Sequence, residues 1–307
     1  MADSETVTAD YRVVTLPCSG QTQCYDDEAE VSCDSLDSAF YGQDAQYVAA
    51  GMCVPRSYSI NGITPEEIVT DNYTRLDWQR TLSPNTYGWQ EAIDYCAGLI
   101  YGGYEDWRLP NDRELESIIN NGYDRPAIDG GAFPHTPSSF FWSSRPNMDS
   151  LEEWAWGVDF GDATTRFGNK GTKYSVRCVR GNERSFSSIF SLSEKPIVTD
   201  RTSGLIWTMY YSSSVSWQAS LGYCQSLNYA GYQDWRLPNI YELKTLIYRG
   251  KANPASYFPD MPSICFWSSS SDVGWGELAF SVDFSRGEVR RVLKNGYWDL
   301  CSAFCVR

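Results

Sequence analysis

The sequence predicts an α+β fold made of two similar domains in tandem. The run Gly-Tyr-Glu-Asp-Trp-Arg-Leu-Pro-Asn at residues 103–111 returns, with one substitution, at residues 231–239. After each copy, apolar residues first follow helical spacing and then alternate with polar residues, as in half-buried strands. A chain of 307 residues is long enough for each repeat to bury a core of its own.

The composition is that of a globular protein and argues against two classes of partner. Hydrophobic residues make up 42% of the chain, and no stretch approaches the roughly 20 apolar residues that a membrane-spanning helix needs. The net charge of −14 is concentrated in residues 1–70, which hold twelve acidic and two basic side chains. Because nucleic acid binding favours a basic face, we expect no nucleic acid partner.

The ten cysteines indicate an exported protein with disulfide bonds. With a single histidine and no Cys-x-x-Cys pair, the common structural zinc sites do not fit. The chain begins Met-Ala-Asp-Ser-Glu, without the basic and apolar segments of a signal peptide. We therefore expect an extracellular, cell-surface or periplasmic protein whose signal peptide has been replaced by Met1. A cytosolic protein with reduced cysteines is the alternative.

Residues 1–63 are interpreted as an acidic lead-in that needs disulfides, because its few apolar residues cannot bury much of a core. Its four cysteines allow three pairings. We expect Cys24–Cys33 to close a hairpin and Cys18–Cys53 to follow by elimination. The acidic residues around 26–30 lack the spacing of a calcium loop and are interpreted as a solvated hairpin tip.

The two repeats account for the rest of the chain. We place the first domain at residues 64–181 and the second at residues 195–307, joined by a polar, serine-rich linker at residues 182–194. In both repeats a strand is expected to lead into a first helix, then into the repeated motif and a second helix. Several antiparallel strands complete each repeat.

The helices are marked by spacing and by caps. Trp89, Cys96 and Ile100 fall on one face of the first helix, so Cys96 is expected to point inward. At the end of each repeated motif, Asn111 and Asn239 precede a glutamate by three residues, which is the spacing of a capping box. Each asparagine therefore predicts the start of a second helix.

The cysteines of the repeats predict three further disulfides. Each repeat carries one cysteine on its first helix and one on its last strand, and a disulfide between them would close a loop of about 80 residues. Two cysteines then remain, both in repeat 2. The expected pairs are Cys96–Cys178, Cys224–Cys305 and Cys265–Cys301.

The motifs resemble those of one known family. Gly-Tyr-x-Asp-Trp-Arg-Leu-Pro-Asn is followed by Phe-Trp-Ser-Ser, Val-Asp-Phe and Val-Arg-Cys-Val-Arg, a series that resembles the Lcl C-terminal domain family in two tandem copies. The family is named for the collagen-like adhesin of Legionella, which binds sulfated glycosaminoglycans and forms trimers through this domain. A disulfide from the first helix to the last strand is also similar to C-type-lectin-like folds. The resemblance therefore implies an exported surface protein with two tandem C-type-lectin-like domains.

Signatures of enzymes are missing from the sequence, and we expect no catalytic residues. It contains no Gly-x-Ser-x-Gly, no His-Glu-x-x-His, no phosphate loop and no dinucleotide-binding motif. The single histidine, His135, matches Asp260 in repeat 2 and is interpreted as part of a surface loop. No cofactor is expected. Calcium is compatible with the acidic loops, but no motif indicates it.

Basic residues in the final hairpins are the candidate ligand-binding residues. Residues 163–180 hold five basic side chains and no acidic one. Aromatic rings nearby would stack on sugar faces, and arginine side chains would bind sulfate or carboxylate groups. A solvated face is the alternative interpretation. The candidate set is Trp154, Trp156, Arg166, Lys170, Lys173, Trp275, Arg286, Arg290, Arg291 and Lys294.

The function expected from these observations is adhesin-like recognition of an extracellular glycan or surface protein. The alternative is a non-enzymatic structural or protein-interaction subunit of an extracellular assembly. A homo-oligomer is compatible with both.

Overall fold

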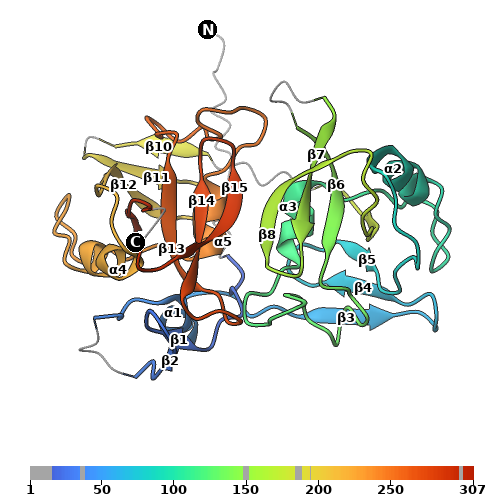
Figure 1. Cartoon of the computed structure of the whole chain (residues 1–307), viewed down its shortest axis with the longest axis horizontal. Coiled ribbons are helices and arrows are strands. Elements are labelled where there is room, and N and C mark those ends of the chain that lie inside the picture. The colour runs from blue at the N-terminus through green and yellow to red at the C-terminus, as the bar shows by residue number, and fades with distance from the viewer. Residues whose placement is uncertain (1–15, 35–38, 148–151, 184–188, 194, 297–299) are drawn as a thin grey trace, which may run out of the picture.

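The computed structural model describes residues 16–34, 39–147, 152–183, 189–193, 195–296 and 300–307 (Figure 1). The start of the expected lead-in, residues 1–15, and residues 184–188 and 194 of the expected linker lie outside the described residues. Helices and antiparallel sheets occur in both repeats, which confirms the predicted α+β class.

Repeat 1 is built around two groups of antiparallel strands. Its elements are β3 (Tyr58–Asn61), β4 (Ile68–Asp71), β5 (Asp77–Gln79), α2 (Trp89–Ala97), α3 (Asp112–Ser117), β6 (Phe140–Pro146), β7 (Trp154–Asp159), β8 (Thr164–Asn169) and β9 (Val179–Arg180). One sheet has the order β3-β4-β5-β9, and the strands β6, β7 and β8 form a meander.

Repeat 2 follows the same order. Its elements are β10 (Phe190–Leu192), β11 (Ile197–Asp200), β12 (Ile206–Tyr211), α4 (Trp217–Gln225), α5 (Ile240–Thr245), β13 (Cys265–Ser271), β14 (Leu278–Asp283), β15 (Glu288–Leu293) and β16 (Phe304–Val306). The sheet β10-β11-β12-β16 corresponds to β3-β4-β5-β9, and β13, β14 and β15 correspond to the meander of repeat 1.

The two meanders join into one six-stranded sheet of order β13-β14-β15-β8-β7-β6. At the junction β8 pairs antiparallel with β15, with Thr165 opposite Val289, at the centre of Figure 1. One buried apolar cluster contains residues of both repeats, including Val158 and Val282. The strands that the sequence predicted to carry the ligand site therefore lie side by side in one sheet.

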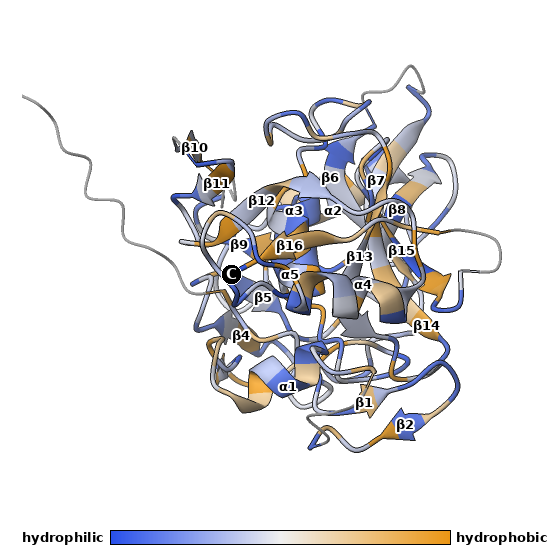
Figure 2. Cartoon of the chain, turned by 90° about the vertical axis from the view of Figure 1, so that its left-hand side faces the viewer, coloured by the Kyte–Doolittle hydropathy of each residue, from blue (hydrophilic) through white to orange (hydrophobic). Residues whose placement is uncertain are grey.

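The lead-in contacts both repeats, and its helix and its first two strands lie at the bottom of Figure 2. The main-chain N–H of Asn121 in repeat 1 donates to the carbonyl of Ser19 at 2.8 Å. In repeat 2, the Ser270 hydroxyl donates to the buried carboxylate of Asp44 at 2.5 Å. The lead-in has three short elements of its own, β1 (Cys24–Tyr25), β2 (Glu30–Val31) and α1 (Asp44–Ala49). Strand β3 also lies within the expected lead-in, residues 1–63, but it pairs with β4 and so belongs to the sheet of repeat 1.

All ten cysteines are paired in the structure, and the five pairs are those expected from the sequence. Two of them close the long loops of the repeats, with sequence separations of 82 and 81 residues. The pairs are Cys18–Cys53, Cys24–Cys33, Cys96–Cys178, Cys224–Cys305 and Cys265–Cys301.

The repeated motif has a structural role in both copies. In repeat 1, the Arg108 guanidinium forms two hydrogen bonds with the carboxylate of Glu114, at 2.7 and 2.6 Å. The side chain of Asn111 accepts from the N–H of Glu114, whose carboxylate in turn accepts from the N–H of Asn111, so the predicted capping box is present. Arg236, Asn239 and Glu242 make the same contacts in repeat 2.

Two local expectations differ from the structure. Helix α2 ends at Ala97 with Gly98 as its C-cap, so Ile100 lies beyond the helix and is 68% exposed. Within the expected linker, Phe190–Leu192 forms β10 and pairs with β11. The ring of Phe190 packs edge to face on Phe258, with ring centroids 5.2 Å apart, and this contact stabilises the strand against repeat 2. In the sequence, the apolar side chain of Phe190 within an otherwise serine-rich segment was the feature that could have predicted this contact.

Candidate functional site

Most arginines of the predicted ligand site are paired with carboxylates. Arg166 in β8 forms an ion pair with Asp159 at the end of β7. Arg290, at the equivalent position of β15, contacts Asp283 at 2.7 Å and Glu288 at 2.8 Å. Arg291 forms ion pairs with two further carboxylates, those of Asp162 and Asp272. The positive charges of these three arginines are therefore compensated by acidic side chains in or next to the strands of the same sheet.

Two other predicted residues are inaccessible to a ligand in this structure. The Trp156 ring is buried and lies 4.8 Å from the guanidinium of Arg249. Lys294 is 0% exposed, and its ammonium donates to the carbonyl of Asp26 at 2.8 Å. Neither side chain is therefore open to a ligand at the surface.

The remaining aromatic candidates lie apart from one another. Trp154 packs edge to face on Phe167, and the Arg286 guanidinium lies 5.5 Å from the same ring. Trp275 is 45% exposed on the loop between β13 and β14 and contacts Arg125 of repeat 1, whose guanidinium lies 5.4 Å from its ring. Trp154 and the buried Trp156 both pack on Phe167, whereas Trp275 contacts Arg125, so Trp154 and Trp275 have different neighbours.

Lys170 and Lys294 occupy equivalent positions but differ in exposure. The carbonyl of each accepts from the N–H of the first residue of a helix, Trp89 or Trp217, at 2.9 Å. Each ammonium lies over the ring of that tryptophan, 4.4 Å away for Lys170 and 4.1 Å for Lys294. The lead-in covers Lys294 through Asp26, whereas Lys170 remains partly exposed. The accessible copy of this arrangement is therefore the one in repeat 1.

Burial gives Lys294 a measurable effect on stability. It lowers the pKa of the ammonium to about 7, although the carboxylates of Asp27, Asp26, Glu277 and Asp272 act in the opposite direction. The unfolded chain then binds more protons than the folded chain above pH 7, so the free energy of unfolding rises with pH up to the ordinary lysine pKa.

We expect Lys294→Met to reduce this rise, by up to about 1.4 kcal/mol per pH unit. Urea unfolding at pH 7, 8 and 9 measures it. The matched control is Lys170→Met, which removes the partly exposed ammonium at the equivalent position of repeat 1. Equal pH dependence in the wild type and Lys294→Met would contradict the assignment.

Repeat 1 has an open cleft of about 760 Å³ whose lining includes another predicted residue, Lys173. It is bounded by the loop before α2, by one side of α2 and by the segment that leads to β9. Two of its tyrosine rings, Tyr87 and Tyr95, stack with centroids 4.7 Å apart. The lining residues are Pro84, Asn85, Thr86, Tyr87, Glu91, Asp94, Tyr95 and Lys173.

The acidic side chains that line this cleft form hydrogen bonds and an ion pair with neighbouring residues. The carboxylate of Glu91 accepts from the N–H of Gly88 at 2.9 Å and lies 3.7 Å from the exposed ammonium of Lys173. Asp94 accepts from the side-chain amide of Gln90 at 2.9 Å. Each carboxylate can accept more hydrogen bonds than these. The cleft thus combines ring faces with acceptors and one cation.

The acidic lining is a feature of repeat 1 alone. Ala219 and Gly222 of α4 stand where α2 has Glu91 and Asp94, whereas Tyr223 matches Tyr95. Of the residues that line the cleft, only Lys173 was among the candidates predicted from the sequence, and the tyrosines and carboxylates were not. A comparison of the two first helices could have found them, because exposed positions that differ between otherwise similar repeats are not required by the shared fold.

The other sequence expectations concern metals and membranes. Among the residues that the structure describes, no group of three or more His, Cys, Asp or Glu side chains could hold a metal ion. His135 is exposed, in line with its interpretation as a loop residue. Within the described ranges, no helix combines the length and apolar character that crossing a membrane requires.

Comparisons with known proteins identify the repeats. No curated protein matches the chain in sequence. The family model of the Lcl C-terminal domain matches it twice, over residues 67–180 and 196–307, which together make up most of the chain. Both matched segments contain the repeated motif and the disulfide from the first helix to the end of the repeat. The chain therefore belongs to the Lcl C-terminal domain family, with two copies of the domain in tandem.

Proposed function

We propose that this protein is an exported, adhesin-like binding protein and that the cleft of repeat 1 binds an extracellular glycan. Membership of the Lcl C-terminal domain family supports a role at a surface. Five disulfides suit an oxidising compartment outside the cytosol. In each repeat a disulfide joins the first helix to the final segment, which supports a C-type-lectin-like fold for each domain.

The observation that carries the proposal is the composition of the cleft. Stacked rings of Tyr87 and Tyr95 offer apolar faces to a sugar ring. Glu91, Asp94 and Asn85 offer oxygens that accept hydrogen bonds from sugar hydroxyls. With two carboxylates and one ammonium, the cleft suits a neutral or singly charged sugar better than a heavily sulfated chain, because the carboxylates repel sulfate groups.

Replacement of Tyr95 by alanine is expected to weaken glycan binding about tenfold or more, which corresponds to about 1.4 kcal/mol. The oxidised protein would be tested on an array of neutral and sulfated glycans, with and without calcium. Tyr223→Ala, at the matching position of α4, is the control and should bind as the wild type does. Circular dichroism would verify that both variants are folded.

Two results would overturn the glycan assignment. Equal losses of glycan binding in Tyr95→Ala and Tyr223→Ala would show that the binding site lies outside the cleft. If the wild type bound no glycan under any condition, a protein partner would replace the glycan as the ligand.

A second function, as an interaction subunit of an extracellular assembly, is favoured by one surface feature. Trp275 is a large side chain left 45% exposed where repeat 2 meets Arg125 of repeat 1. Exposed tryptophan and arginine side chains are typical of interface centres. Concentration-dependent assembly in sedimentation experiments, without glycan binding, would favour this function over the first.

A further inference from the structure

A cavity of about 80 Å³ lies between the two repeats, at α3 and α5. Helix α3 contributes Arg113, Glu116 and Ser117, and α5 contributes the three equivalent positions, Tyr241, Lys244 and Thr245. Leu16, Pro17 and Tyr73 complete the lining, so apolar carbon surrounds much of the space. About 10–15 Å³ is enough for one water molecule, so the cavity can hold a larger group.

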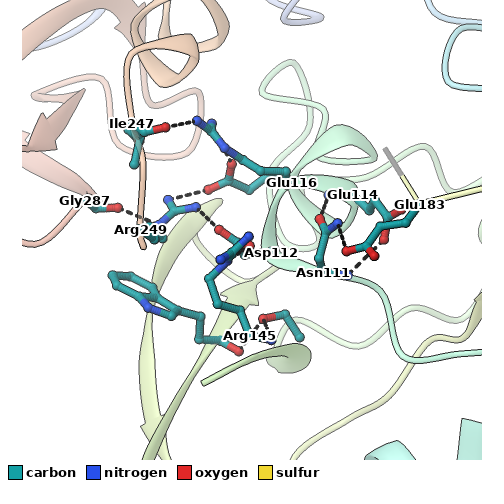
Figure 3. Close-up of polar contacts among 12 residues, drawn as sticks. Asn111, Asp112, Glu114, Glu116, Arg145, Glu183, Ile247, Arg249 and Gly287 are labelled. Carbon is teal, nitrogen blue, oxygen red and sulfur yellow. Dashed lines mark hydrogen bonds and ion pairs between the residues drawn. The ribbon is translucent and has the colours of Figure 1, made fainter. Parts of the chain in front are cut away.

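Positive charge exceeds negative charge around this cavity. The carboxylates of Asp112 and Glu116 are both held by Arg249, at 2.6 and 2.7 Å (Figure 3). Arg145 also pairs with Asp112, and Arg113 lies 3.6 Å from Glu116. The carboxylates of Asp112 and Glu116 are therefore already paired with arginine side chains, without any contribution from Lys244.

Lys244 lines the cavity and is only 4% exposed, and within the described residues its ammonium forms no ion pair. The ammonium lies 4.2 Å from the ring of Tyr241, and the guanidinium of a further cation, Arg56, lies 4.7 Å from the same ring. Asp71 also faces Arg56, but it forms hydrogen bonds with Tyr73 and Thr74.

An ammonium without an ion-pair partner beside a largely apolar cavity is unfavourable, and it is stabilised by an anion or by loss of its proton. Burial lowers the pKa of Lys244 to about 7; Glu116 opposes this, whereas Arg56, Arg113 and Arg249 act with burial. An anion in the cavity would supply the missing negative charge.

We propose that the cavity between α3 and α5 binds a small anion, chloride or a short carboxylate, on the ammonium of Lys244. None of the residues that line this cavity lines the cleft of repeat 1, so the two sites are separate. Because the lining comes from equivalent positions of both repeats, the anion joins the repeats and stabilises their contact.

The experiment is thermal unfolding at pH 6.5 and constant ionic strength, with sodium chloride or sodium acetate replacing sodium gluconate, whose anion is too large for the cavity. The melting temperature of the wild type is expected to rise with the logarithm of the chloride or acetate concentration, as for a ligand that binds only the folded state. Lys244→Met should lose this rise, and Lys244→Arg, which keeps the charge, should retain part of it. The matched control is Lys251→Met, which removes an exposed ammonium 5.3 Å from a tyrosine ring.

Either of two results would overturn the proposal. One is an equal response to chloride, acetate and gluconate in the wild type. The other is an undiminished response in Lys244→Met. Crystals grown with bromide in place of chloride provide a test that needs no variant, because a bound bromide would give an anomalous peak beside Lys244 Nζ, and the lack of a peak there would exclude a halide at this site.

Discussion

Arg249→Met is expected to lower the free energy of unfolding by about 3–5 kcal/mol, because it leaves two buried carboxylates without their shared partner. The side chain of Arg249 is fully buried and contacts Asp112 of repeat 1 at 2.6 Å and Glu116 at 2.7 Å (Figure 3). It also donates to the carbonyl of Gly287 at 2.8 Å, so it ties α3 of repeat 1 to the turn before β15.

The loss caused by Arg249→Met should also depend on pH. Burial by itself would raise the pKa of Glu116, but Arg249, with Lys244 and Arg113, holds it at about 2. A carboxylate with a lowered pKa stabilises the folded state above its ordinary pKa, and this contribution disappears as the pH falls toward 2. The difference between wild type and variant should therefore be largest near pH 7 and should shrink in acid.

Urea unfolding at pH 7 and pH 4 measures both effects. Arg290→Met is the matched control, since Arg290 also contacts two carboxylates but is 44% exposed. An exposed ion pair contributes about 0–1 kcal/mol, so this variant should lose little stability. Similar losses in the two variants would show that the buried cluster does not hold the repeats together.

Removal of the Cys96–Cys178 disulfide by a double substitution to alanine is expected to cost about 4.5 kcal/mol. The disulfide closes a loop with a sequence separation of 82 residues. Its loss increases the conformational freedom of the unfolded chain, and the increase grows with the length of the loop. The equivalent pair Cys224–Cys305, with a separation of 81 residues, should cost the same amount.

The lead-in supplies the comparison for this prediction. Cys24–Cys33 has a separation of only 9 residues, so its removal should cost about 2.6 kcal/mol on the same model. Denaturant unfolding of the three double-alanine variants would test this order. A larger loss for Cys24–Cys33 than for either long-loop disulfide would show that contacts of the lead-in, rather than loop length, decide the cost.

Several features of this protein followed from local patterns in the sequence. The offset between Trp107 and Trp235 predicted two repeats, and the change from helical to alternating spacing predicted the α+β class. Asn111 and Asn239 predicted helix starts because a capping box involves residues only three positions apart. The long-loop disulfides also followed, since each repeat offered one cysteine on a helix and one near its end.

The candidate site could not be predicted in the same way. A basic residue in a hairpin has the same appearance in the sequence whether it is exposed, paired or buried. Arg166 and Arg290 lie opposite carboxylates of neighbouring strands, and Lys294 is covered by Asp26, which is 268 residues away in the chain. Lys170 and Lys294 therefore have the same predicted role from the sequence, although only Lys170 remains accessible.

The sequence by itself determined the repeats, the class of fold and the positions of the caps, because these depend on residues that are close in the chain or that recur at a regular offset. Tertiary structure alone decided that β8 pairs with β15, that Arg249 joins Asp112 to Glu116 and that Lys244 lies in a cavity between α3 and α5. Exposure and charge pairing depend on which surfaces meet when the repeats and the lead-in pack together. The pairing of β8 with β15 and the contacts of Arg249 join residues more than 100 positions apart, beyond the range over which a sequence pattern can specify them.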